Sequence, residues 1–241
     1  MNIRTLLPLA LSAALPAIAA DAPLLAIPGK VIYESKLDAG LAAPWKAAKG
    51  KWESAEGALR GAEKPEDKHG AVARLPNKLG DFIAEYEVKL DGAKSTTFTV
   101  NAVKDHMARI MIGPNFVQVQ RDDNDHEGPD KAVVFGRFKA DIKPGTWHKV
   151  RMEMVGDTML GQVDEIIAAG SSELFKQDRM APGFTVAGQS AEFRNIKITE
   201  ATLNPEWEKV KSTLPKGEVA PPAPRPGAAA AGKGKGKKKA E

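Results

Sequence analysis

The sequence predicts an all-β fold, a sandwich of two antiparallel sheets with jelly-roll topology. Three observations predict it: apolar and polar residues alternate along short segments, Gly and Pro separate these segments, and helical periodicity appears only near the C-terminal end. Such alternation turns one side of each strand toward a core and the other toward solvent or a groove. A closed β-barrel is the alternative architecture.

The clearest strand is DFIAEYEVKL at 81–90, where apolar residues from Phe82 to Leu90 occupy every second position. Further strands are predicted at 95–103, 108–112, 116–120, 147–155 and 192–198. Turn signals that contain Gly separate them at 90–94, 112–115, 143–146 and 155–157. Large aromatic side chains are expected in the core between the sheets, namely Trp45, Trp52 and Trp147.

Residues 1–20 have the composition of a secretory signal peptide. Arg4 is followed by an apolar run from Leu6 to Ile18, and small residues precede Asp21. The run is too short to span a bilayer. We therefore expect cleavage after Ala20 and a secreted or periplasmic protein that is not transmembrane after cleavage.

Three further segments follow the predicted signal peptide. Residues 26–201 form the predicted sandwich, residues 202–219 a short helical extension, and residues 220–241 a tail rich in Pro, Ala, Gly and Lys. In the extension, Asn204 is the expected N-cap of a helix that begins at Pro205. The tail has almost no large apolar side chain to bury, so we predict it to be disordered.

Most of the excess positive charge lies in the tail. Outside residues 221–241 the chain has 29 basic and 30 acidic residues. We therefore expect no specific nucleic-acid binding by the domain, while the tail is a candidate for contact with anionic glycan or an envelope surface. The chain has no cysteine, which excludes disulfides, thiol catalysis and thiolate metal sites.

Four segments follow one another as GKWESAEGALRG (50–61), LGDFIAEYEVKL (79–90), KPGTWHKVRMEMVGD (143–157) and AEFRNIKI (191–198). In this order they resemble the motifs of the 3-keto-disaccharide hydrolase domain family. The resemblance implies the concanavalin A-like jelly-roll fold of lectins and laminarinase-type glucanases. It also implies a hydrolase that cleaves glycosidic bonds of 3-keto-disaccharides or related saccharides.

A strand motif of the family, Glu-Val-Gln-Ile-x-Asp, aligns with residues 118–123, which read QVQRDD. Gln118, Gln120 and Asp122 share one strand face, and the resemblance implies that this face binds the saccharide. The family's Asn-Ser-Gly-Ile-x-x-Arg segment is replaced here by KSTTFTVNA, without its Gly and Arg. Arg109, one strand later, is the candidate substitute for that arginine.

The acidic stretch DDNDHE at 122–127 has three interpretations. As a catalytic loop, Asp123, His126 and Glu127 supply the acid and base for a 3-keto sugar, with His106 and Arg109 as partners. As a metal loop, its oxygen ligands suit a structural calcium, although the EF-hand spacing is absent. No other cofactor is expected. The third interpretation is a solvated hairpin tip.

These observations leave three functional hypotheses. The leading one is an exported, carbohydrate-active hydrolase. The second is a glycan-binding module without turnover, which grips a saccharide through Gln118 and Gln120. The third is a cell-envelope interaction protein that is anchored by its basic tail.

Overall fold

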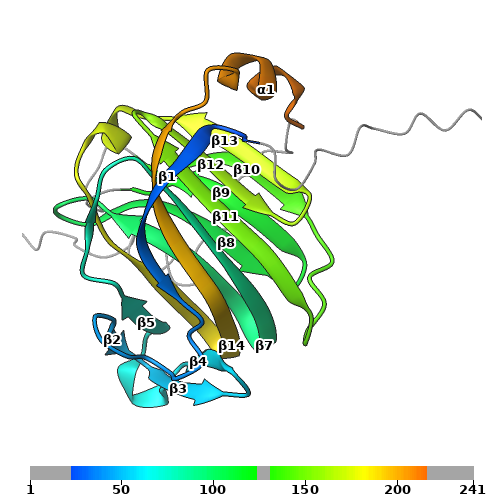
Figure 1. The fold of residues 1–241 in the computed structure, drawn as a ribbon. Coiled ribbons are helices and arrows are strands. Elements are labelled where there is room, and N and C mark those ends of the chain that lie inside the picture. Colours follow the sequence, from blue (N-terminus) through cyan, green and yellow to red (C-terminus); the bar gives the residue numbers. More distant parts are fainter. Residues whose placement is uncertain (1–22, 124–130, 216–241) are drawn as a thin grey trace, which may run out of the picture.

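The computed structural model describes residues 23–123 and 131–215, and Figure 1 shows their fold. In chain order the elements are β1 (Ala26–Ser35), β2 (Lys46–Lys49), β3 (Lys51–Ala55), β4 (Ala58–Ala62), the 3-10 helix η1 (Pro65–Asp67), β5 (Ala71–Arg74), β6 (Lys78–Leu79), β7 (Phe82–Asn101), β8 (His106–Gly113), β9 (Phe116–Arg121), β10 (Val133–Lys139), β11 (Trp147–Val155), β12 (Thr158–Val163), β13 (Ile166–Ser171), the 3-10 helix η2 (Glu173–Lys176), β14 (Arg179–Leu203) and α1 (Trp207–Thr213). The predicted signal peptide, the basic tail and the candidate residues His126 and Glu127 lie outside the described residues.

The long strands β7 and β14 belong to both layers of the fold. They pair antiparallel with each other along residues 82–101 of β7. The first part of β7 also pairs with β11, and the part from Thr96 onward pairs with β8. We call the layer of β1, β14, β7, β11, β12 and β13 the β11 layer, and that of β5, β14, β7, β8, β9 and β10 the β9 layer. The predicted antiparallel sandwich is confirmed.

The prediction of a turn at 90–94 is wrong, because β7 continues through this segment. The glycine signal marks a bend instead. At this bend, Gly92 of β7 and Gly188 of β14 have positive φ angles of +75° and +93°. The register between β7 and β14 shifts on both sides of Gly188. Bulges of this kind bend a strand and increase its twist. The bend lets one strand pass from the β11 layer into the β9 layer.

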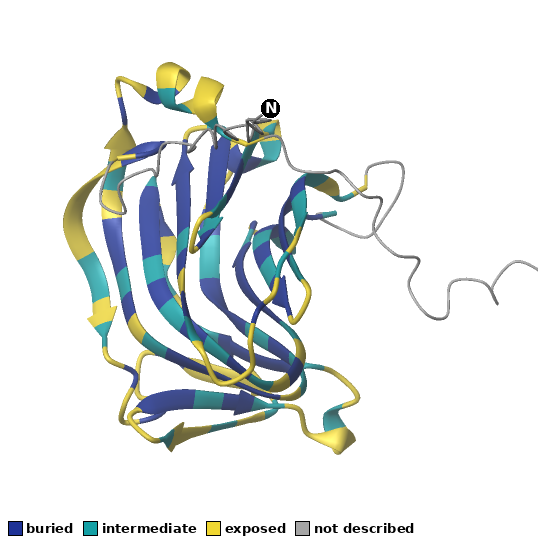
Figure 2. Cartoon of the chain, turned by 90° about the vertical axis from the view of Figure 1, so that its right-hand side faces the viewer, coloured by how far each residue is buried: buried dark blue, intermediate teal, exposed yellow. Residues whose placement is uncertain are grey.

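An aromatic cluster fills the middle of the core between the layers. The Phe184 ring stacks on Phe193 at 4.2 Å and on Trp45 at 5.2 Å between centroids. Tyr86 meets Phe184 edge-on at 5.0 Å. All four side chains are buried, and Figure 2 shows the buried residues along the inner parts of the strands.

Direct contact between β12 and β9 fixes which way the alternating side chains point. A Cβ atom on Gly161 would lie 2.7 Å from Val119 and 2.9 Å from Ile110, so the two layers pack closely there. Residues that alternate with these inner positions point outward. Gln118 and Gln120 therefore lie on the outer face of the β9 layer, and Gln162 lies on the opposite, outer face of the β11 layer.

A second apolar cluster covers one end of the β11 layer. Its buried members include Leu25 from the N-terminal segment, Ile83, Leu160 and Ile167 from the strands, and Trp207 from α1. The helix therefore lies on the outer face of this layer, at one end of the strands (Figure 1). In the part of the chain that the structure describes, no helix is long and apolar enough to cross a membrane.

The short C-terminal helix is confirmed, but it begins at Trp207 rather than Pro205. Asn204 is buried and has a different role from the expected N-cap. Its side-chain oxygen accepts a hydrogen bond from the backbone N–H of Glu206 at 3.0 Å, and its amide donates to the carbonyl of Leu24 at 2.8 Å. Asn204 thus joins the N-terminal segment to the turn before the helix.

Trp147 does not lie in the core, contrary to the sequence prediction. Its ring is only partly buried, and the Arg194 guanidinium lies 4.1 Å from the ring centroid. Lys89 lies over the same ring at 5.0 Å. Trp147 is the first residue of β11 and lies at the edge of a charged outer surface. Its ring packs there against cations.

Candidate active site

A row of polar side chains crosses the outer face of the β9 layer. The strand register places Arg74 opposite Gly183, Gly183 opposite Thr99, and Thr99 opposite Arg109. Arg109 in turn lies opposite Gln120 of β9. Directly paired residues share a face, so these side chains form one continuous row from β5 to β9.

Gly183 leaves room for the arginine at one end of the row. The Arg74 guanidinium donates a hydrogen bond to the Thr99 hydroxyl across the β14 strand that lies between them. A Cβ atom on Gly183 would lie 3.0 Å from the Arg74 side chain and 2.1 Å from the carbonyl oxygen of Ala73. A larger residue at 183 would therefore displace Arg74 from the row.

A chain of hydrogen bonds runs along β9. Arg137 of β10 donates to Gln118, and Gln118 donates to Gln120. Gln120 donates to Asp122 at 2.6 Å. The Arg109 Nε atom lies 2.8 Å from one Asp122 carboxylate oxygen and 2.7 Å from the other.

The β9 part of this row is buried but internally satisfied. Gln118, Gln120 and Asp122 are 3%, 8% and 2% exposed, respectively. Buried polar networks hold a fixed geometry when each member has a partner. The carboxylate of Asp122 and the two amides are therefore pre-positioned, and the Arg109 guanidinium is held beside them.

Arg74 adds a second positive charge to the row, near the carboxylates of Asp105 and Asp122. Burial, and then the nearby charge of Arg109, lower the pKa of Arg74 to about 10. Its guanidinium still keeps its charge at neutral pH. Within residues 23–123 and 131–215, no carboxylate forms an ion pair with Arg74. The charges of Asp122 and Asp105 attract this guanidinium from a distance and partly oppose the lowering of its pKa.

His106 lies beside these charges at the start of β8. Its Nδ1 atom is 3.3 Å from the Asn101 side-chain oxygen, and its Nε2 atom is 3.5 Å from a carboxylate oxygen of Asp105. Burial, followed by the charge of Arg109, lowers the pKa of His106, while Asp105 and Asp122 partly oppose this shift. The imidazole is therefore neutral at pH 7 and has the protonation state of a base.

The structure brings together four of the residues that the sequence singled out, namely Arg109, Gln118, Gln120 and Asp122. Asp123 follows directly and is the last described residue of its segment. The roles assigned to all five residues, and to His126 and Glu127, stay predictions.

Sequence reasoning missed Arg74, Thr99 and Arg137. Arg74 is the one charged residue of the strand segment AVAR, and Arg137 lies between apolar residues in VVFGRFK. Each is a weak local signal. Their place in the row depends on strand pairings between segments far apart in the chain.

The predicted calcium site cannot be located in the described part of the chain. Among residues 23–123 and 131–215, no three His, Asp or Glu side chains gather closely enough to hold a metal ion. Most of the acidic stretch from Asp122 to Glu127 lies outside these residues. Calcium binding there stays a prediction.

The sequence matches a family model described as the 3-keto-alpha-glucoside-1,2-lyase-like domain over residues 34–199. The chain belongs to this family. It is therefore a carbohydrate-related domain, and the resemblance seen in the sequence motifs is confirmed. No match was found among the curated proteins.

Solved structures similar to this chain include sugar-binding and sugar-cleaving proteins. A laminarinase from Rhodothermus marinus has a TM-score of 0.57 at 10% identity, over 73% of this chain and 99% of that one. The carbohydrate-binding module CBM66 from Bacillus subtilis has a TM-score of 0.51 at 16% identity, over 65% and 95%. A galectin-like protein of unknown function from Bacillus subtilis has a TM-score of 0.55 at 8% identity, over 75% and 100%. At these identities the similarity establishes the jelly-roll fold alone.

Proposed function

We propose that this chain cleaves 3-keto-α-glucosides by an elimination across C1 and C2 on the outer face of the β9 layer. The family description supports the substrate class. One observation carries the location of the site: the charged Arg74, which forms no ion pair among the described residues, lies near the neutral His106. This pair supplies the two functions that removal of a proton next to a ketone requires.

In the proposed first step, His106 accepts the C2 proton of the sugar. The electron pair of the C2–H bond forms the C2–C3 double bond of an enolate, and negative charge moves to the C3 oxygen. Arg74 and Arg109 stabilise this oxygen, since both guanidiniums point to the same row. Fixed donors aimed at developing charge commonly contribute about 3–4 kcal/mol to transition-state stabilisation.

In the second step, the enolate collapses and the C1–O bond breaks. A C1–C2 double bond forms, the C3 ketone is restored, and the bond electrons leave with the glycosidic oxygen. That oxygen takes up a proton, which we assign to the acidic stretch with Asp123, His126 and Glu127. Addition of water to the new double bond completes a net hydrolysis.

A glycan-binding module without turnover is the second candidate. Gln118 favours it, because an amide stands where the family often has a carboxylate. The side chains from Gln118 to Asp122 are also hydrogen-bonded to one another and held in fixed positions, as on a binding surface. Binding of a saccharide without product formation would support this candidate.

Incubation with 3-keto-trehalose and 3-keto-sucrose, followed by chromatography of the products, tests the proposal. We expect His106→Asn to lower kcat by about 10²–10⁴-fold, as for the loss of a general base. Arg74→Lys should lower kcat by about 10²-fold. His69→Asn, in an exposed loop, is the matched control and should keep wild-type activity. Wild-type kcat in His106→Asn would reject the proposed site.

We also propose that the protein acts outside the cytoplasm, as residues 1–20 predict, with the basic tail in contact with an anionic envelope surface. N-terminal sequencing of the exported protein should give a chain that begins at Asp21. Deletion of residues 220–241 should release it from envelope fractions; unchanged fractionation would contradict the role of the tail.

A further inference from the structure

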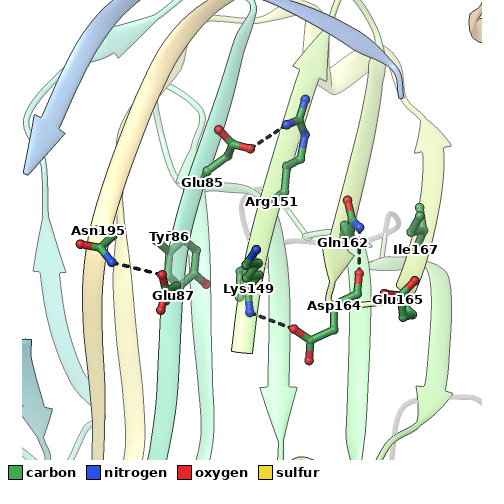
Figure 3. A pocket seen from close by; sticks show the side chains of 11 residues that line it. Glu85, Tyr86, Glu87, Lys149, Arg151, Gln162, Asp164, Glu165, Ile167 and Asn195 are labelled. Carbon is green, nitrogen blue, oxygen red and sulfur yellow. Dashed lines mark hydrogen bonds and ion pairs between the residues drawn. The ribbon is translucent and has the colours of Figure 1, made fainter. Parts of the chain in front are cut away.

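A pocket of about 390 Å³ opens on the outer face of the β11 layer (Figure 3). This face is opposite to the polar row, because Gln162 and Gln120 point away from each other across the core. The pocket size lies within the range of sites that bind small molecules. It uses none of the residues assigned to the proposed reaction.

Three pairs of hydrogen-bond donors and acceptors line the pocket. On β7 and β11, Glu85 accepts from Arg151 at 2.6 Å. At the other side of β7, Glu87 accepts from the amide of Asn195 at 3.1 Å. At the turn after β12, Asp164 accepts from the backbone N–H of Lys149 at 2.9 Å. Figure 3 shows these pairs side by side across the sheet.

Glu87 is held as an ionised acceptor. Partial burial acts to raise its pKa, but hydrogen bonds from Arg194 and Asn195 outweigh this effect and leave the pKa below the ordinary value for Glu. Arg194 contacts the other Glu87 oxygen at 2.5 Å. The acceptor is therefore charged and fixed in position at neutral pH.

Other polar groups of the pocket keep free bonding capacity. Lys149 and Glu165 are exposed, and in the part of the chain that the structure describes neither side chain has a hydrogen bond or ion pair. Gln162 uses its amide N–H in a bond to the Asp164 carbonyl at 2.8 Å, which leaves its oxygen available. Ile167 adds an apolar wall.

The charge and shape of the lining indicate the class of ligand. Four carboxylates and two cations line the pocket, which disfavours an anion. Donors and acceptors stand next to one another, and a hydroxyl group needs both because it donates and accepts. From Asn195 on β14 to Ile167 on β13 the lining crosses five strands, about 19 Å at the usual strand spacing. An elongated ligand with many hydroxyl groups fits this span.

We propose that this pocket binds a neutral oligosaccharide and forms a second saccharide site on the sandwich. The site lies across the core from the polar row and requires no turnover, so it goes beyond the proposed function and does not depend on it. A chain bound here would hold the domain on a glycan while the other face stays open.

Titration of ¹⁵N-labelled protein with maltotriose, cellotriose and laminaritriose tests this proposal. At least one trisaccharide should shift the amide signals of residues 85–87, 149–151, 162–167 and 195. Lys149→Ala and Gln162→Ala should each weaken this binding about fivefold, the loss expected for one hydrogen bond. Lys46→Ala removes another exposed lysine, from β2, and should leave the affinity unchanged.

Three results would overturn the proposal. One is the absence of these shifts with all three sugars at millimolar concentration. A second is wild-type affinity in both pocket variants. The third is that deletion of residues 220–241 shifts the same amide signals while sugar shifts none of them. This result would assign the pocket to the lysine-rich tail. Loss of keto-sugar cleavage alone affects none of these readouts.

Discussion

The ion pair between Arg109 and Asp122 provides a quantitative test of the polar row. The Asp122 side chain is 3% exposed and the Arg109 side chain 22%. Removal of one partner from a buried pair costs about 3–5 kcal/mol, because the other charge stays buried without compensation. Since Arg109 keeps some contact with solvent, we expect Asp122→Ala to cost about 3 kcal/mol. Arg109→Ala leaves Asp122 with the bond from Gln120, so we expect about the same cost.

The double variant should lose less stability than the two single variants together. The expected coupling free energy is about 1–3 kcal/mol, the upper range for residues in direct contact. Urea unfolding followed by tryptophan fluorescence measures it, provided that the m-value is unchanged. The exposed pair Lys51 and Glu53 is the control, with an expected coupling below about 1 kcal/mol. Additive costs at Arg109 and Asp122 within about 0.5 kcal/mol would refute the network.

Three further predictions concern the core and the pH dependence. Phe184→Ala should lower the free energy of unfolding by about 3–5 kcal/mol, since the ring is fully buried; a loss below about 1 kcal/mol in chemical denaturation would contradict its central place. Tyr86→Phe should raise stability by up to about 1 kcal/mol, because the buried hydroxyl has no hydrogen-bond partner among the described residues, and a clear loss in the same assay would reveal a partner. His106 has a folded pKa below its ordinary 6.5. Near and below about pH 6.5 it therefore binds fewer protons in the folded than in the unfolded state. The free energy of unfolding and kcat should both fall as the pH drops through that range. His106→Asn should flatten both profiles, and an unchanged stability profile would contradict the assignment.

The period-two pattern predicted the layers and part of the site. Because alternate residues share a face, Gln118, Gln120 and Asp122 could be placed together from the sequence alone. Arg109 was only the candidate substitute for an arginine that the family has and this chain lacks. The same rule predicted the inward position of the apolar residues in 81–90. These features depend on local geometry, which a single segment determines.

Features set by distant pairing were not predictable in this way. Arg74 reaches the row only because β5 pairs with residues near the start of β14, more than a hundred residues later in the chain. Gly92 resembled a turn signal because a turn and a bulge both use a positive φ angle, and only the partner strand distinguishes them. Trp147 was predicted to lie in the core because of its size alone. In the structure its ring packs against a cation on the outer surface instead.

The late position of β14 in the chain has a consequence for the order of folding. β1 and β6 pair with no strand except β14 within the described residues, and β4, β5 and β7 each depend on it for one edge. Neither layer can close while the ribosome still holds the last third of the chain, and contacts between such distant segments form slowly. Among the described residues, β1 and β6 therefore have no strand partner until β14 has been synthesised, whereas the strands from β7 to β13 can pair with one another before it.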